Sequence, residues 1–159
     1  QGGFRPGAVR KLRQVARVYV CLDADRAGIS SAMKLAIGLG VARVHMVALP
    51  DGQDPNDYLR QGSQEGFLAL VGASRSPVEY GVGLVPPGAD PSTLRARLEP
   101  VLRLLAALPP IEAAGYMDQV AATLKLGRKG AAAVEAEVAE YRAGGYTSCP
   151  ACGTALMGR

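Results

Sequence analysis

Hydrophobic residues in the first third of the chain follow the order strand, helix, strand. A continuous β-branched and aromatic run at 17–22 predicts a strand buried on both faces, as in a parallel sheet. Residues 27–39 carry apolar side chains at helical spacing, and Gly40 marks the end of that helix. A second strand is predicted at 41–49. Because a helical crossover joins neighbouring strands in parallel, both strands should end at the same edge of the sheet.

The remaining pattern is helical. Apolar spacing predicts an amphipathic helix at 8–16, before the first strand, and helices at 57–61, 64–71, 94–108 and 130–143 after the second. A further helix should start at Pro109-Pro110, with Tyr116, Val120 and Leu124 on its apolar face. Asp90 or Ser92 should cap the helix that contains Leu94, and Pro100 should kink it.

The fold class predicted is α/β, with a parallel sheet and flanking helices followed by a small all-helical appendage. A Gly- and Pro-rich stretch separates the two parts. The predicted divisions are an α/β part, a linker, a helical subdomain and a tail, at 1–80, 81–93, 94–143 and 144–159.

Composition narrows the class of protein. The chain has 159 residues, is 48% hydrophobic and 20% charged, and therefore has enough apolar side chains for a core. It holds no apolar run of the roughly 18 residues that span a bilayer, and three cysteines make no disulfide framework. A cytoplasmic protein is expected. Because residue 1 is Gln and the first methionine is Met33, we expect the chain to be a piece of a longer protein.

The net charge of +4 is unevenly distributed. Residues 1–64 hold nine Lys and Arg against five Asp and Glu, whereas residues 65–159 hold nine of each. A group without any acidic neighbour precedes the first strand and comprises Arg5, Arg10, Lys11, Arg13 and Arg17. Such a group favours a polyanionic partner such as nucleic acid, although a solvated helix face has the same composition.

Two acidic residues follow the first strand. Asp23 and Asp25 are two positions apart, so they project to the same side if the strand geometry continues. Two carboxylates held this close repel each other unless a cation lies between them, and Mg²⁺ prefers such oxygen ligands. The N-terminus of the helix that follows favours an anion such as phosphate, and Arg26, just before that helix, is placed to meet it.

A second acidic group follows the second strand. Asp54 precedes Pro55 and is therefore biased towards extended geometry, and Asp57 lies just beyond it. The crossover should bring this loop to the edge that carries Asp23. Three or four carboxylates there would hold one or two Mg²⁺ ions, the usual apparatus of phosphoryl or nucleotidyl transfer. A helix-capping role is the alternative for Asp54.

The tail carries a Cys-x-x-Cys motif at Cys149 and Cys152. A structural zinc site needs four ligands. The motif is therefore half of a zinc-ribbon pattern, and zinc is expected only if the parent protein supplies a second pair.

Residues 17–80 resemble the second half of a TOPRIM domain, specifically that of bacterial DNA primases of the DnaG type. The motifs that carry the resemblance are Asp-x-Asp-x-Ala-Gly at 23–28 and Leu-Pro-x-Gly-x-Asp-Pro at 49–55, separated by a helix and a strand. Residues 108–126 are similar, more weakly, to the helical part that follows TOPRIM in primases.

The resemblance implies roles for particular residues. Asp23, Asp25 and Asp54 would be the catalytic ligands of Mg²⁺ or Mn²⁺. The family has a further Asp where this chain has Asn56, which leaves Asp57 displaced by one position. TOPRIM domains also open with a strand that bears a glutamate, proposed as general acid or base. No Glu precedes Asp23 here, so the resemblance implies part of a catalytic core that is inactive alone.

The resemblance also implies a function. The complete protein would copy single-stranded DNA into a short RNA primer from nucleoside triphosphates, with a replicative helicase as partner and no membrane, in the cytoplasm at the nucleoid. Arg10, Lys11, Arg13 and Arg17 would contact the template. The alternatives are a non-catalytic TOPRIM module that binds nucleic acid, and another TOPRIM enzyme, a nuclease or a topoisomerase.

Overall fold

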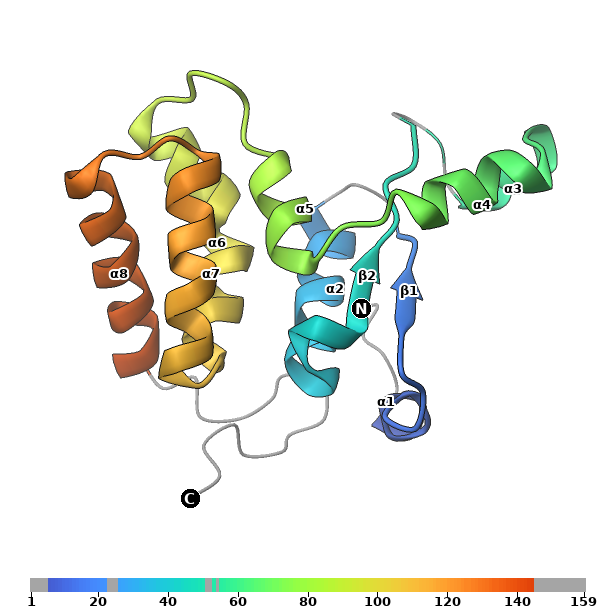
Figure 1. Ribbon diagram of the computed structural model, residues 1–159, viewed down its shortest axis with the longest axis horizontal. Coiled ribbons are helices and arrows are strands. Elements are labelled where there is room, and N and C mark those ends of the chain that lie inside the picture. The colour runs from blue at the N-terminus through green and yellow to red at the C-terminus, as the bar shows by residue number, and fades with distance from the viewer. Residues whose placement is uncertain (1–5, 23–25, 51–52, 54, 145–159) are drawn as a thin grey trace.

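The computed structural model describes residues 6–22, 26–50, 53 and 55–144 (Figure 1). Short strands and a helix crossover come first, and longer helices follow. In chain order the elements are α1 (Pro6–Leu12), β1 (Val18–Val20), α2 (Arg26–Leu39), the 3-10 helix η1 (Val41–Arg43), β2 (Val44–Met46), α3 (Pro55–Gln61), α4 (Gln64–Gly72), α5 (Pro77–Gly83), α6 (Pro91–Ala107), α7 (Pro110–Thr123) and α8 (Arg128–Ala143).

The two strands pair in parallel, as the crossover argument predicts. Val18 lies opposite Val44 and Val20 opposite Met46. The Val47 N–H donates to the Val20 carbonyl at 2.9 Å and extends the pairing by one residue. The α/β class with a parallel sheet and following helices is therefore confirmed.

The second strand is shorter than predicted. Residues 41–43 form η1 because the chain leaves α2 at Gly40 with a φ of 95° and turns tightly. In that turn the Arg43 N–H donates to the Gly40 carbonyl at 3.1 Å. Glycine adopts this positive φ without steric cost. Only then does the backbone become extended.

One face of the sheet is buried and the other is not. Val18, Val20, Val44 and Met46 belong to the hydrophobic core, which α2 and α5 complete. Tyr19, between the two core valines of β1, is 46% exposed. The prediction that the first strand is buried on both faces is therefore wrong for the described residues, because no described helix covers the second face.

The second edge of β2 is paired as well. Met46 and Arg75 exchange two backbone hydrogen bonds, of 2.7 and 3.0 Å, in an isolated antiparallel bridge. Directly afterwards Ser76 and Glu79 form a capping box that starts α5. The Ser76 N–H donates to Glu79 Oε2 at 3.0 Å, and this backbone hydrogen bond is the main reason that the pKa of Glu79 is lowered. Sequence reasoning missed α5, which includes residues 81–83 of the predicted linker.

Helix α5 joins the sheet to the helical part through a very close approach. Gly81 faces Val101 of α6 and Met33 of α2, and a Cβ on Gly81 would overlap Cγ2 of Val101 and lie 3.0 Å from Cε of Met33. Val101 is fully buried. One hydrophobic cluster consequently runs from Val9 of α1 to Val138 of α8. The division of the chain at 81–93 stays a prediction.

The helical part follows the predicted pattern closely. Asp90 caps α6, and Leu98, Leu102 and Leu105 lie in the core. Pro100, where a kink was expected, lies inside α6, which continues to Ala107.

The carboxyl end of α8 is tied to the turn between α6 and α7. The Arg142 guanidinium donates to the carbonyl oxygens of Leu105, Ala106 and Leu108 at 3.4, 3.3 and 3.2 Å. They lie at the end of a helix, where carbonyls generally lack partners within the helix, although Leu105 also accepts the Leu108 N–H at 3.2 Å. Arg142 thus completes the hydrogen bonding of the turn from a different helix.

Helices α3 and α4 extend away from the rest of the molecule (Figure 1). Tyr58 and Phe67 contact each other with ring centroids 6.3 Å apart. Leu59 and Leu68 are each more than half exposed, and α4 has no buried residue. This pair of helices therefore adds little to the core. Within the described residues, no helix is both long enough and apolar enough to cross a membrane.

The contact at Gly81 leads to a stability prediction. Gly81→Ala should lower the free energy of unfolding by about 1–3 kcal/mol, because the added methyl group overpacks the junction with Val101. Urea unfolding measures this change. In a Val101→Ala background the loss should be smaller, since the clash is removed. Gly115→Ala in α7 is the control, because nothing lies within 4 Å of its Cβ position and the loss should be absent. Equal losses at Gly81 in both backgrounds would contradict the packing argument.

The cap of α6 leads to a pH prediction. Asp90 accepts hydrogen bonds from the hydroxyls of Ser92 and Thr93 and from both backbone N–H groups, and the pKa of Asp90 is lowered well below its usual 3.8. A lowered pKa stabilises the folded state fully above about pH 4, and this stabilisation is lost as the pH falls towards the folded-state value.

Thermal unfolding of Asp90→Ala should therefore show a lower Tm than the unmodified protein at pH 7, with a difference that shrinks below pH 3.8. Asp90→Asn keeps a capping oxygen, so its Tm at pH 7 should lie between those of Asp90→Ala and the unmodified protein. A Tm difference that stays constant from pH 7 to pH 2 would refute the assigned cap.

Candidate functional site

The chain leaves both strands at one edge of the sheet. After β1 it passes Cys21 and Leu22 and reaches α2 at Arg26, and after β2 it reaches α3 at Pro55. The parallel register places the ends of both strands next to each other. This edge, at the carboxyl ends of parallel strands, is where open α/β sheets bind ligands.

The three principal acidic residues of the predicted site lie outside the described residues. They are Asp23, Asp25 and Asp54, and their convergence on a metal stays a prediction. The described residues next to them either follow β1 and precede α2, or follow β2 and precede α3. In the described part of the chain there is no group of three His, Cys, Asp or Glu side chains that would hold a metal ion.

Two further predicted residues fall on helices. Arg26 is the first residue of α2 and its side chain is not described, so its contact with phosphate stays a prediction. Asp57 lies in the first turn of α3 and is exposed. An acidic residue at this point stabilises the helix dipole. Asp57 therefore has a structural role available besides the predicted metal-binding one. Cys149 and Cys152 lie outside the described residues, and zinc binding stays a prediction.

A buried amide beside Asp54 was missed by sequence reasoning. The Gln53 side-chain oxygen is buried and has no hydrogen-bond partner. An acceptor without a partner costs about 1–3 kcal/mol, which a donor or a cation would recover. Carboxylate and amide oxygens together are the hard donors that Mg²⁺ prefers. The Gln53 oxygen is therefore a donor of the kind that Mg²⁺ prefers.

Helix α5 contributes an aromatic residue near the same edge. Tyr80 is buried, and burial raises the pKa of Tyr80, with the Cys21 thiol as a second cause. Cys21 directly follows β1. Tyr80 and Val20, the last residue of β1, belong to the same hydrophobic core.

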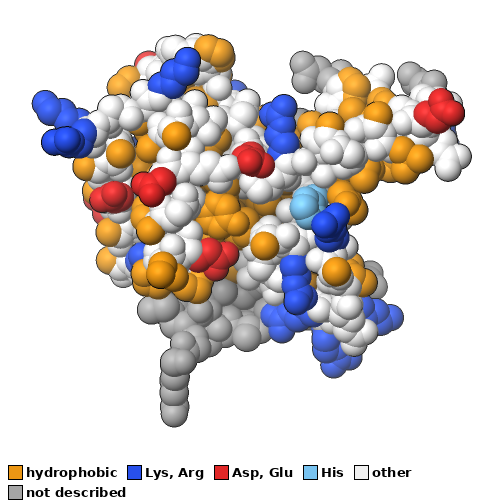
Figure 2. Space-filling model, viewed as in Figure 1, with side chains coloured by type: hydrophobic (Ala, Val, Ile, Leu, Met, Phe, Trp, Pro, Cys, Tyr) orange, Lys and Arg blue, Asp and Glu red, His pale blue; other side chains and the backbone are white. Residues whose placement is uncertain are grey.

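The predicted basic residues gather around α1 and the start of β1. Arg10, Lys11, Arg13 and Arg17 are all exposed. In Figure 2, Lys and Arg side chains cluster at this end of the molecule beside His45, with no Asp or Glu among them. Arg13 also has a structural role, because its Nε donates a hydrogen bond to the Gly38 carbonyl of α2 at 3.2 Å. Arg43 joins the group, and its Nη1 donates to the Arg13 carbonyl at 2.9 Å.

An aromatic pair on the sheet was also missed. Tyr19 of β1 and His45 of β2 are register partners, and their ring centroids lie 5.3 Å apart at an interplanar angle of 31°. Sequence reasoning gave His45 no role beyond its place in a strand. The pair follows from the register of the two strands, which cannot be read from the sequence.

The comparisons with known proteins agree with this architecture. Residues 2–59 match the family model described as Toprim-like. This segment includes α1, both strands, α2 and most of α3. The chain thus carries a Toprim-like segment, followed by helices.

The relatives define the group more narrowly. Over 123 residues, 74% of this chain, it is 32% identical to a DNA primase of Geobacillus stearothermophilus. Over 109 residues, 66% of this chain, it is 30% identical to a DNA primase of Lactococcus lactis subsp. lactis strain IL1403. The resemblance to the TOPRIM region of bacterial DNA primases is confirmed.

The matched parts cover 21% and 17% of these two relatives, so the chain corresponds to about a fifth of a primase. No solved structure matches the chain. The match extends well beyond the Toprim-like segment, and the helical part is therefore related to primases too.

Proposed function

We propose that this chain is the metal-binding part of a DNA primase, which synthesises RNA primers on single-stranded DNA by Mg²⁺-dependent nucleotidyl transfer. The observation that carries the proposal is the parallel pairing of β1 and β2 within the Toprim-like segment of this chain, which is similar to DNA primases. The pairing places the carboxyl ends of both strands side by side, which supports the proposal that the acidic residues following them share one site. The chain covers about a fifth of the length of its relatives. Primer synthesis is therefore proposed for the complete protein and not for this chain alone.

Asp23, Asp25 and Asp54 would hold the ion, Mg²⁺ or Mn²⁺, with Gln53 as a neighbouring oxygen donor. When bound, the ion would neutralise the charge that develops on the transferred phosphoryl group. Arg26, at the start of α2, would orient the triphosphate through the helix N-terminus. The cations of α1 would bind the backbone of the template.

The partners proposed are single-stranded DNA, the RNA primer, nucleoside triphosphates and a replicative helicase, and the location proposed is the cytoplasm at the nucleoid. The relatives reported above are DNA primases, which favours primer synthesis over a TOPRIM nuclease or topoisomerase. The cationic surface around α1 favours one alternative, a non-catalytic module that binds nucleic acid.

Titration of the protein with Mn²⁺, followed by electron paramagnetic resonance of the free ion, tests the metal site. Asp23→Asn combined with Asp25→Asn should weaken Mn²⁺ binding by at least about tenfold, because two anionic ligands become neutral while their size is retained. Asp54→Asn should weaken it as well. Asp118→Asn is the matched control, because Asp118 is an exposed carboxylate on α7. Mn²⁺ binding by the Asp23/Asp25 double variant equal to that of the unmodified protein would refute the site.

A further inference from the structure

A series of hydrogen bonds connects helix α7 with the end of strand β2. We call it the α7–β2 link and define it by Gln119, Glu79, Ser76, Arg75 and Met46. These residues belong to α7, to the first turn of α5, to the two positions before α5 and to β2. Figure 1 shows α5 between the helical part and the strands, so the link crosses the junction of the two parts.

The first section of the link lies at the start of α5. Gln119 Nε2 donates to Glu79 Oε1 at 2.9 Å, and the Ser76 N–H donates to Glu79 Oε2 at 3.0 Å. The Glu79 N–H donates to the Ser76 hydroxyl oxygen at 3.1 Å, which completes the capping box. One carboxylate therefore binds a side chain of α7 and the backbone that enters α5. Both bonds favour the ionised carboxylate, in agreement with the lowered pKa of Glu79.

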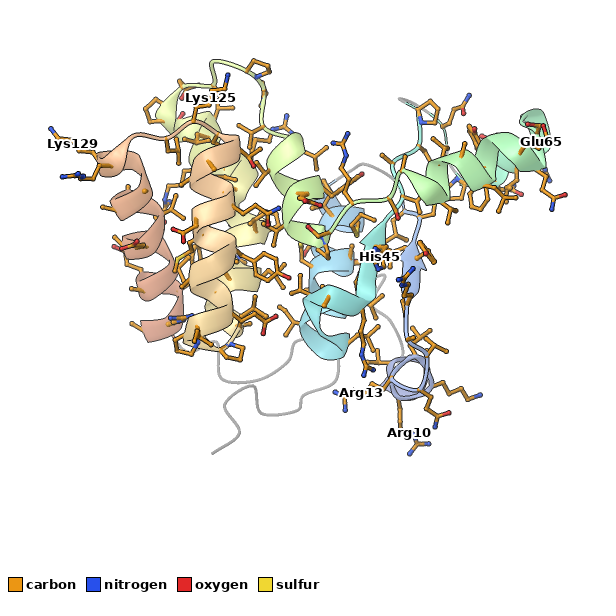
Figure 3. The ribbon with its side chains drawn as sticks, viewed as in Figure 1. Arg10, Arg13, His45, Glu65, Lys125 and Lys129 are labelled. Atoms are coloured by element: carbon orange, nitrogen blue, oxygen red, sulfur yellow. The ribbon has the colours of Figure 1, made fainter. Side chains whose placement is uncertain are left out.

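The second section of the link reaches the sheet. Arg75 lies directly before the capping box and exchanges two backbone hydrogen bonds with Met46, of 2.7 and 3.0 Å. Met46 is the last residue of β2 and follows His45, which is labelled on that strand in Figure 3. The next residue, Val47, donates its N–H to the carbonyl of Val20, the last residue of β1, at 2.9 Å. The link therefore ends at the hydrogen bonds that close the sheet at its carboxyl end.

These closing hydrogen bonds precede both acidic groups in sequence. Asp23 is three positions after Val20, and Asp54 is seven positions after Val47. Ligands from two segments bind an ion tightly only when the segments are already held in place, because ordering them on binding costs free energy. A strand end that opens for part of the time lowers the apparent affinity in proportion to the fraction of molecules in which it is closed. Whatever keeps Met46 paired therefore contributes to metal affinity.

A capping box stabilises its own helix, and this would be its complete role if the start of α5 were free of other elements. Two observations point further. The acidic residue of the box also binds α7 through Gln119, and Arg75, just before the box, is paired with β2. In addition, Pro77 and Val78, directly after the cap, are buried in the core. The start of α5 is therefore fixed from several sides, and loosening the cap should loosen the pairing of Arg75.

We infer that Glu79 is a positioning residue for the proposed metal site, because it holds Arg75 against Met46 and so keeps the two strand ends closed. The inference rests on the proposed function for the ion itself. It gives residues beyond the Toprim-like segment 2–59 a part in that site, since Arg75, Glu79 and Gln119 all follow the segment. The helical part then contributes to metal affinity through hydrogen bonds to the sheet.

Mn²⁺ titration followed by electron paramagnetic resonance, combined with amide hydrogen exchange recorded without metal, tests the positioning role. Glu79→Ala should raise the Kd for Mn²⁺ by about threefold, and exchange at the Met46 and Arg75 N–H groups should accelerate by at least this factor, because the pairing is open in more molecules. Glu79→Gln keeps a side-chain oxygen for the Ser76 N–H and should recover most of the affinity. Gln119→Leu removes only the bond to α7 and should raise the Kd by less than Glu79→Ala does.

Asp90→Ala is the matched control. Asp90 also caps a helix with its carboxylate, but it caps α6, and its hydrogen bonds run to Ser92 and Thr93 of that helix. The control variant should have a lower Tm but an unchanged Kd for Mn²⁺ and unchanged exchange at Met46. Circular dichroism checks that each variant is folded.

An unchanged Kd for Mn²⁺ in folded Glu79→Ala would overturn the inference, and so would unchanged exchange at Met46 and Arg75. An equal rise of the Kd in Asp90→Ala would overturn it as well, since lower stability alone would then explain the effect. Failure of the metal proposal has a different signature, which is equal Mn²⁺ binding by the Asp23/Asp25 double variant and the unmodified protein. In that case the positioning role fails with it, while the exchange measurements still decide whether Glu79 controls the pairing of β2.

Discussion

The parallel pairing of β1 with β2 is the constraint on which the rest of the structure depends. Three register partners and one further hydrogen bond fix the pairing, and the alternation of side chains along each strand follows from it. Val18, Val20, Val44 and Met46 must then lie under α2 and α5, while Tyr19 and His45 must lie on the opposite face. The same pairing aligns the strand ends, so one interaction determines the edge that is proposed for metal binding.

The second constraint is the close contact between α5 and its neighbours. Since Gly81 has no Cβ, the backbone of α5 approaches Val101 of α6 and Met33 of α2 directly. Tyr80 of the same helix lies in the hydrophobic core together with Val18 and Val20 of β1. The strands, the crossover helix and the helical part are consequently joined in one core, although a Gly- and Pro-rich stretch lies between them in sequence.

The sequence predicted most of the helices because their apolar residues recur at helical spacing, and Leu98, Leu102 and Leu105 are buried as that spacing requires. The prediction from sequence failed where tertiary contacts determine the local structure. Residues 41–43 form a 3-10 turn after Gly40 instead of a strand, and α5 was missed although its Gly81 allows the close approach to Val101. The pairing of Tyr19 with His45 could not be predicted, since it depends on register. For the acidic site the sequence supplies the residues and the structure supplies the common edge, while the positions of Asp23, Asp25 and Asp54 stay predictions.

The hydrogen bonds of Arg142 have a consequence for how the helical part can be divided. One guanidinium group near the end of α8 serves three carbonyl oxygens that belong to the junction of two other helices. A shortened polypeptide that stops before residue 142 would lose these three hydrogen bonds and loosen a corner that lies 34 to 37 residues upstream in the chain. Any dissection of this region into smaller pieces must therefore keep α8 whole, even when the piece of interest is the sheet.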